Sequence, residues 1–178
     1  MTDNYYYTNS NNTTTTTNVT VNNFGGSYSV VGQPSIGASF IDQLLCKYNS
    51  PACNTGNTLY TDGKAANIDP AYALAFFLHE STFGKYGVAH DNLGLGNIRC
   101  TQGYSCNNGF RAYPSWETGY KDWYALMNSS TYIGGGLTTV DQIIPRYAPN
   151  GDNNNEAGYI AALKQSVDLW RSGAVSIP

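Results

Sequence analysis

The sequence predicts a single, mainly α-helical (α+β) domain with a small irregular or β lobe. Apolar residues recur at helical spacing in several separate segments from Pro34 onward. One segment, residues 71–81, is apolar nearly all round, as expected for a helix at the centre of a domain. A glycine-rich stretch, residues 85–112, lacks this periodicity and predicts the small lobe. The length of 178 residues fits one domain of ordinary size.

The first 32 residues differ from the rest in composition. They contain runs of Tyr, Asn and Thr without helical periodicity, so they offer little apolar surface to offset the entropy cost of ordering. We expect a Thr/Asn-rich arm or linker over residues 1–32, whose β-branched residues can still pair as a strand, and the domain over residues 33–178. The start shows no signal-peptide pattern. If the protein is secreted, its signal has been removed or lies upstream, and the arm suggests a larger multidomain protein.

The first predicted helix follows Pro34, and the central helix begins at Asp69. Apolar and aromatic side chains between residues 36 and 48 share one helix face. Asp69 is a favourable N-cap, and Pro70 is a favourable first helical residue. Gly84 and Gly87 are expected to end the central segment.

Three further helices are predicted in the second half. Pro114 opens one that carries an aromatic stripe, which core packing explains most simply. Thr139 and Gln142 form a possible capping box for a short helix, which we expect Pro145 to end. The last helix covers roughly residues 155–171 and has one apolar face.

Charge and composition exclude several classes of function. Charged residues make up only 12% of the chain, the net charge is −3, and the nine Lys and Arg residues are scattered, so we expect no nucleic-acid partner. No apolar run approaches the roughly 18 residues of a membrane span. No phosphate-binding loop or nucleophile elbow is found, and we expect no metal and no cofactor. The neutral, hydroxyl-rich and aromatic composition suits uncharged polar ligands such as glycans, and we expect a monomer.

The four cysteines form two closely spaced pairs, Cys46 with Cys53 and Cys100 with Cys106. Turn-forming residues surround each pair, which favours two local disulfides in an oxidising, extracellular setting. Bound zinc is the alternative, but neither pair has the C-x2–4-C spacing with nearby histidines. If both bridges form, no thiol nucleophile remains.

Glu80 is the sharpest candidate for chemistry. It is one of three glutamates, with Glu117 and Glu156, and it lies at the end of the most apolar segment. It either faces solvent or is partly desolvated, and desolvation raises the pKa of a carboxyl group. A carboxylic acid that stays neutral can protonate a glycosidic leaving oxygen. The neighbouring His79 is interpreted as a core or cleft-wall residue, because the zinc motif H-E-x-x-H fails at Phe83.

Four short segments carry motifs in a consistent order between Ile68 and Leu169. They are His-Glu-Ser-Thr-Phe-Gly at 79–84, Asn-Leu-Gly-Leu-Gly-Asn-Ile-Arg at 92–99, Phe-Arg-Ala-Tyr at 110–113 followed by Ser115, and Ile-Pro-Arg-Tyr-Ala-Pro at 144–149 followed by Asp152 and Tyr159. The first resembles the catalytic-acid segment of lysozyme-fold peptidoglycan hydrolases. The others, in this order, resemble bacterial endo-β-N-acetylglucosaminidases.

This resemblance implies a lysozyme-like fold and a secreted, cell-wall-associated protein that cleaves β-1,4 bonds of peptidoglycan glycan strands. It makes Glu80 the proton donor and matches Tyr147 to a tyrosine that lines the cleft beside the acid. The expected substrate-binding residues are Asn97, Tyr113, Asp91 and Asn92. Tyr113 either stacks on a sugar or braces the helix that Pro114 opens.

The chain departs from the family at the second carboxylate. The family often has one between the second and third motifs, but residues 100–109 contain no acid. Asp91, Glu117 and Asp152 remain candidates by their order alone. With one acid, attack by the substrate's 2-acetamido group or lytic transglycosylation is preferred over water inversion with Asp91 or Asp152 as base. The competing class is a non-catalytic glycan-binding module of the same fold.

Overall fold

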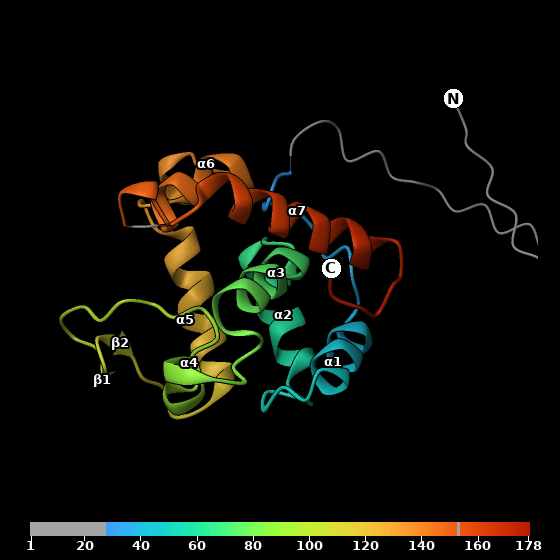
Figure 1. Cartoon of the computed structure of the whole chain (residues 1–178), viewed down its shortest axis with the longest axis horizontal. Helices are drawn as coiled ribbons and strands as arrows, with labels where there is room; N and C mark the ends of the chain where they lie inside the picture. The colour runs from blue at the N-terminus through green and yellow to red at the C-terminus, as the bar shows by residue number, and fades with distance from the viewer. Residues whose placement is uncertain (1–27, 153) are drawn as a thin grey trace, which may run out of the picture.

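The computed structural model describes residues 28–152 and 154–178. These residues form seven α-helices, two 3-10 helices and one antiparallel hairpin (Figure 1), which confirms the predicted mainly helical domain with a small lobe. Residues 1–27 of the expected arm lie outside the described part. The elements are α1 (Ala38–Lys47), α2 (Gly56–Ala66), α3 (Pro70–Ser81), α4 (Gly87–Asn92), β1 (Cys106–Asn107), β2 (Phe110–Arg111), α5 (Trp116–Asn128), η1 (Ile133–Gly135), α6 (Val140–Tyr147), η2 (Asn150–Asp152) and α7 (Glu156–Arg171).

Helix α3 lies at the centre of the domain, as predicted. Asp69 caps its N-terminus, because its Oδ1 accepts a hydrogen bond of 3.1 Å from the Ala71 N–H. The residues from Pro70 to Phe77 are all buried. Helices α2 and α7 pack against α3 (Figure 1), and the Phe77 ring contacts Trp123 of α5 at a centroid distance of 5.3 Å. The apolar segment is therefore covered on every side, which positions its C-terminal end beside α7.

The described part of the expected arm, residues 28–32, packs against the domain. Val30 is 2% exposed. Its N–H donates to the Thr138 carbonyl at 2.9 Å, and its carbonyl accepts from the Asp69 N–H at 3.0 Å. These five residues thus join the α6 side of the molecule to the start of α3, and they lie with the domain.

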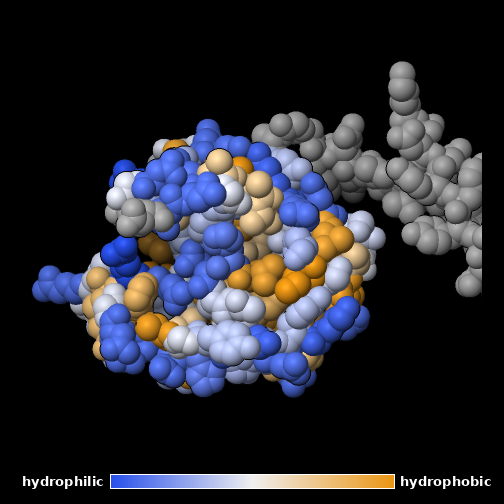
Figure 2. Space-filling view, viewed as in Figure 1, coloured by the Kyte–Doolittle hydropathy of each residue, from blue (hydrophilic) through white to orange (hydrophobic). Residues whose placement is uncertain are grey.

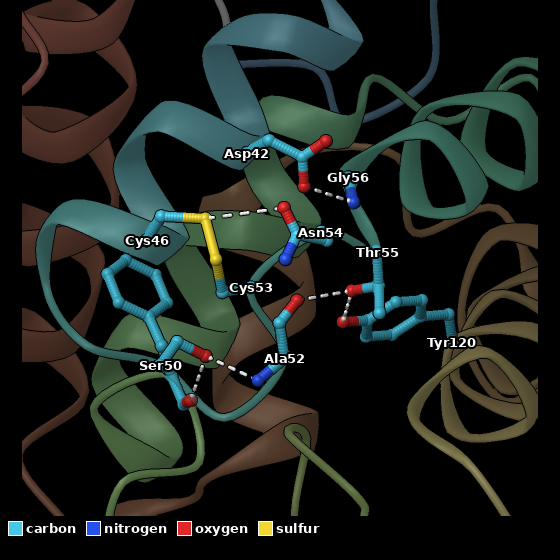
Figure 3. The surroundings of a disulfide bond; sticks show 10 residues. Asp42, Cys46, Ser50, Ala52, Cys53, Asn54, Thr55, Gly56 and Tyr120 are labelled. Carbon is cyan, nitrogen blue, oxygen red and sulfur yellow. Dashed lines mark hydrogen bonds between the residues drawn. A yellow bond between two sulfur atoms is a disulfide. The ribbon is translucent and has the colours of Figure 1, made fainter.

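Helix α2 was not predicted, because its sequence lacks an apolar face. Only Leu59, Gly56 and Gly63 are buried in it. A Cβ at Gly63 would lie 2.7 Å from the Tyr124 hydroxyl, so the helix packs through close backbone approach rather than through large side chains. The Gly56 N–H donates to the Asp42 carboxylate at 2.7 Å (Figure 3), which ties the start of α2 to α1.

Two further differences concern short helices. The stretch expected to be irregular contains α4. The expectation that Pro145 ends the short sixth helix is wrong, because Pro145 lies inside α6. Proline has a φ that suits a helix and removes only one donor, and the Ala148 N–H still donates to the Ile144 carbonyl at 2.9 Å.

Both predicted disulfides are present, so the alternative of zinc bound by these thiols is wrong. Cys46–Cys53 joins the end of α1 to the turn before α2, with Cα atoms 4.7 Å apart (Figure 3). Cys100–Cys106 closes the loop of the small lobe, with Cα atoms 5.8 Å apart. Among the residues that the structure describes, no cysteine is free.

Candidate active site

Glu80 lies in the last turn of α3 and faces the first turns of α7. Its Oε1 accepts a hydrogen bond of 2.6 Å from the Tyr159 hydroxyl. Its backbone carbonyl accepts a second hydrogen bond, of 2.9 Å, from the Asn97 side-chain amide. Two segments distant in sequence therefore position Glu80 from either side.

A cavity of about 450 Å³ opens beside Glu80, within the range of about 300–1,000 Å³ typical of small-ligand sites. Figure 2 shows the surface hollowed between the α6–α7 turn and the small lobe. The residues that line the cavity are His79, Glu80, Asn154, Asn155, Gly158 and Tyr159. Apart from Glu80 and the imidazole of His79, this lining is neutral, so it suits an uncharged polar ligand.

The environment favours the neutral form of Glu80. Burial raises the pKa of its carboxyl above the ordinary value, while the hydrogen bonds from Tyr159 and Asn97 act in the opposite direction and are smaller. The N-terminus of α7 also faces the cavity, through Asn155 and Gly158, and a helix N-terminus favours negative charge. Because burial is the largest effect on this pKa, the acid stays protonated to a higher pH than a free glutamate does.

His79 forms part of the cavity wall. Its ring stacks on Tyr159 with a centroid distance of 3.7 Å and an interplanar angle of 24°. Burial lowers the pKa of the His79 imidazole, which favours a neutral ring at neutral pH. His79 therefore adds a hydrogen-bonding group beside Glu80 without adding a charge.

Tyr159 bonds directly to the candidate acid, and the sequence analysis did not name it as a candidate site residue. It is 4% exposed, and burial, followed by the charge of Glu80, raises the pKa of its hydroxyl well above the ordinary value. Because it stays protonated, it can donate to Glu80 across the working pH range. The sequence does contain a signal for a site role of Tyr159, since this residue belongs to the fourth motif and lies on the apolar face of the last helix.

Tyr147, the expected partner of the acid, lies close to Glu80 without touching its carboxyl. Its hydroxyl donates to the Gly96 carbonyl at 2.8 Å, and its ring meets Phe76 edge-on with centroids 5.0 Å apart. Burial first, and then the charge of Glu80, raises the pKa of Tyr147 well above the ordinary value. Tyr147 is not among the residues lining the cavity.

Tyr113 and Asn92, two of the expected substrate-binding residues, make structural contacts. The Tyr113 hydroxyl donates to Asp122 Oδ2 at 2.7 Å, in agreement with a bracing role. Asn92 is 2% exposed, and its side-chain amide donates to the Asn107 carbonyl at 3.0 Å. Both residues hold the small lobe in place.

The other candidate carboxylates do not meet Glu80 in the described part of the chain. Asp91 is exposed and lies 3.3 Å from the His90 ring nitrogen. Glu117 lies in the first turn of α5, and the side chain of Asp152 lies outside the described residues. Among those described, Glu80 contributes the one carboxylate that lines the cavity.

In the described residues, no group of three or more His, Cys, Asp or Glu side chains could hold a metal ion. No helix of this part is long and apolar enough to cross a bilayer.

Comparisons with known proteins give the fold an independent reference. No protein-family model matches the chain, and no curated protein matches it. The structure is similar to the crystal structure of a peptidoglycan hydrolase from Sphingomonas sp. A1, with a TM-score of 0.53 and 17% sequence identity. The match covers 80% of this chain and 97% of that chain. Together with the helical architecture and its small hairpin, this similarity confirms the predicted lysozyme-like fold.

Proposed function

We propose that this chain is a peptidoglycan hydrolase that cleaves β-1,4 glycosidic bonds of the glycan strand, with Glu80 as its general acid. The observation that carries the proposal is the carboxyl of Glu80, held at a cavity wall where burial raises its pKa. A solved structure of similar fold is a peptidoglycan hydrolase, and the order of the motifs favours an endo-β-N-acetylglucosaminidase.

The hydrogen bond from Tyr159 orients the acid for proton donation. Oε1 of Glu80 accepts a hydrogen bond of 2.6 Å from the Tyr159 hydroxyl. The acidic proton of the neutral carboxyl is therefore carried by Oε2. That oxygen can donate to the glycosidic oxygen of a strand bound in the cavity, and the C–O bond to the leaving sugar breaks as the proton is transferred.

Substrate assistance supplies the nucleophile for this bond cleavage. The carbonyl oxygen of the 2-acetamido group attacks the anomeric carbon as the leaving sugar departs, forming a cyclic oxazolinium ion. Water then adds to the anomeric carbon and gives its proton to the Glu80 carboxylate, which restores the acid and the acetamido group. The resemblance assigns Tyr147 the task of orienting this group, but its hydroxyl donates to the Gly96 carbonyl and it does not line the cavity, so its proposed role is to position the wall beside Glu80.

Lytic transglycosylation is the alternative activity, favoured by the same observation of a single described carboxylate in the cavity. There the 6-hydroxyl of the sugar attacks the anomeric carbon, and the product is an anhydro sugar. A non-catalytic glycan-binding module is the alternative class.

The proposed setting is extracellular and associated with the cell wall. The two disulfides support it, because such bridges persist in oxidising compartments. A glycan substrate in the wall places the enzyme in the same compartment.

Replacing Glu80 by Gln tests the proposal, because Gln keeps the size of the side chain and removes the acidic proton. We expect E80Q to fold normally and to lose about 100-fold or more in the release of reducing ends from purified cell walls. E117Q changes a glutamate of a helix first turn outside the cavity and serves as the matched control with full activity. Full activity of E80Q would end the proposal, and an anhydro-muramic product would identify the transglycosylase.

A further inference from the structure

The small lobe carries an exposed aromatic ring with a cation against one face. Tyr104 is 46% exposed and lies in the loop that the Cys100–Cys106 disulfide closes. The guanidinium carbon of Arg111 lies 3.5 Å from the centroid of its ring. Since one face is covered and almost half of the residue is exposed, the opposite face is directed to solvent.

This ring is held in a fixed orientation. Arg111 is 9% exposed, and its two terminal nitrogens donate to Asp122 and to the Thr101 hydroxyl, both at 2.8 Å. The Tyr104 N–H donates to the Thr101 carbonyl at 3.3 Å. Asp122 of helix α5 therefore holds Arg111 in place against the Tyr104 ring, and we call Tyr104 with Arg111 the platform. A preorganised side chain loses little conformational entropy when a ligand binds.

The chemistry around Tyr104 suits a saccharide. Residues 101–109 are all exposed and none of them is charged, while the charge of Arg111 is balanced by Asp122 at 2.8 Å. An aromatic face offers a large apolar contact area to the C–H face of a pyranose ring. Neutral hydroxyls and amides offer donors and acceptors to sugar hydroxyl and acetamido groups. The side chains that provide them are Thr101, Gln102, Ser105, Asn107 and Asn108.

The platform lies within reach of a strand that occupies the cavity. Asn97 touches the Glu80 backbone at 2.9 Å, and Tyr104 follows seven residues later. Seven residues span at most ~25 Å, and the turn between Thr101 and Tyr104 shortens the path. A glycan strand several sugars long can therefore contact both places. Two contacts on one polymer increase its affinity without a new interaction at the reacting bond.

We infer that Tyr104, backed by Arg111, is a saccharide-binding platform on the small lobe that holds a glycan strand outside the Glu80 cavity. The inference rests on the proposed function for the identity of the polymer, peptidoglycan. The Cys100–Cys106 bridge and the Arg111–Asp122 pair keep the platform formed, so the binding site exists before the strand arrives.

The test measures binding apart from turnover. Sedimentation with insoluble, purified peptidoglycan compares the full chain carrying E80Q with the same chain carrying E80Q and Y104A. We expect Y104A to weaken the Kd roughly tenfold, and Y104F, which keeps the ring, to bind like the parent. Y86A is the matched control, because Tyr86 is the other large exposed aromatic of the described residues, at 69%, and it should leave the Kd unchanged. Equal melting temperatures of the variants show that each one folds.

Turnover separates this inference from the proposed function. In the otherwise unchanged enzyme, Y104A should raise KM about tenfold with kcat retained, as for lost uniform binding. If Y104A binds and turns over like the parent while E80Q is inactive, the platform is refuted and the enzyme stands. If E80Q remains fully active while Y104A weakens binding, the catalytic proposal fails and the platform stands. Equal losses in Y86A and Y104A also refute the platform, because they show a general surface effect.

Discussion

Replacing Tyr159 by Phe removes the hydrogen bond that the Tyr159 hydroxyl donates to the Glu80 carboxyl and leaves Asn97 in place. The bond is 2.6 Å long and runs from the Tyr159 hydroxyl to Oε1. Phe keeps the aromatic ring, so the stack with His79 at 3.7 Å and the contact with Phe76 at 5.8 Å are retained. A hydrogen bond to a charged group contributes about 1.5–3 kcal/mol, and this one stabilises ionised Glu80 more than the neutral acid.

The direction of the effect follows from that preference. The bond lowers the pKa of Glu80, so its removal raises that pKa and the neutral acid persists to higher pH. Losing about 1.5 kcal/mol from the ionised form changes the ratio of ionised to neutral acid by roughly tenfold at a given pH. The alkaline limb of the kcat profile, which reports the general acid in the bound enzyme, should therefore move to higher pH. On that limb Y159F should retain about tenfold more of its maximal activity than the parent does.

The assay is the initial rate of reducing-end release from saturating cell walls, measured across the pH range at constant ionic strength. Y28F is the matched control, because Tyr28 also donates a 2.6 Å hydrogen bond to a carboxylate, that of Asp168, which does not line the cavity. An alkaline limb of Y159F that stays in place or moves to lower pH would refute the reasoning. So would an equal movement in Y28F.

Three further predictions concern the scaffold that holds the site. D69A removes a carboxylate that is 2% exposed, caps α3 and accepts a 2.9 Å bond from Arg171. We expect the free energy of unfolding in urea to fall by about 3–5 kcal/mol, and a loss below about 1 kcal/mol would contradict this. C46S/C53S opens a bridge of sequence separation 7 and should lower the free energy of unfolding by about 2–3 kcal/mol, measured without reductant against the parent. G96A would place a Cβ 2.5 Å from a ring carbon of buried Trp123, so unfolding in urea should show a loss of about 1–3 kcal/mol, whereas G151A, with no atom within 4 Å, should show little change.

The sequence predicts those elements whose signals are local. Asp69 and Pro70 mark the start of α3 because capping and fixed φ act within one turn, and the unbroken apolar run places this helix at the centre. Thr139 and Gln142 form the capping box in the structure, for the same reason. The disulfides follow from short cysteine spacing and the turn residues between them.

The elements that were missed depend on contacts between distant residues. Helix α2 packs through Gly63 against Tyr124, which lies 61 positions later. The sequence of α2 alone does not indicate this contact. Glu80 was found from its apolar neighbours, but the tyrosine that bonds to it lies 79 positions away. Only the packing of α7 on α3 brings these two residues together.

The stereochemistry of the product distinguishes the mechanisms that need only Glu80 from the one that needs a second carboxylate as base. Attack by the acetamido group followed by water inverts the anomeric carbon twice, so substrate assistance retains its configuration. Direct attack by water, with a base such as Asp152 or Asp91, inverts it once. We therefore predict that NMR during the first turnovers shows a β-anomeric reducing end, and that D152N and D91N keep the kcat of the parent. An α-anomer with activity lost in D152N would instead make Asp152 the base, and a product without a reducing end would place the chain among the transglycosylases.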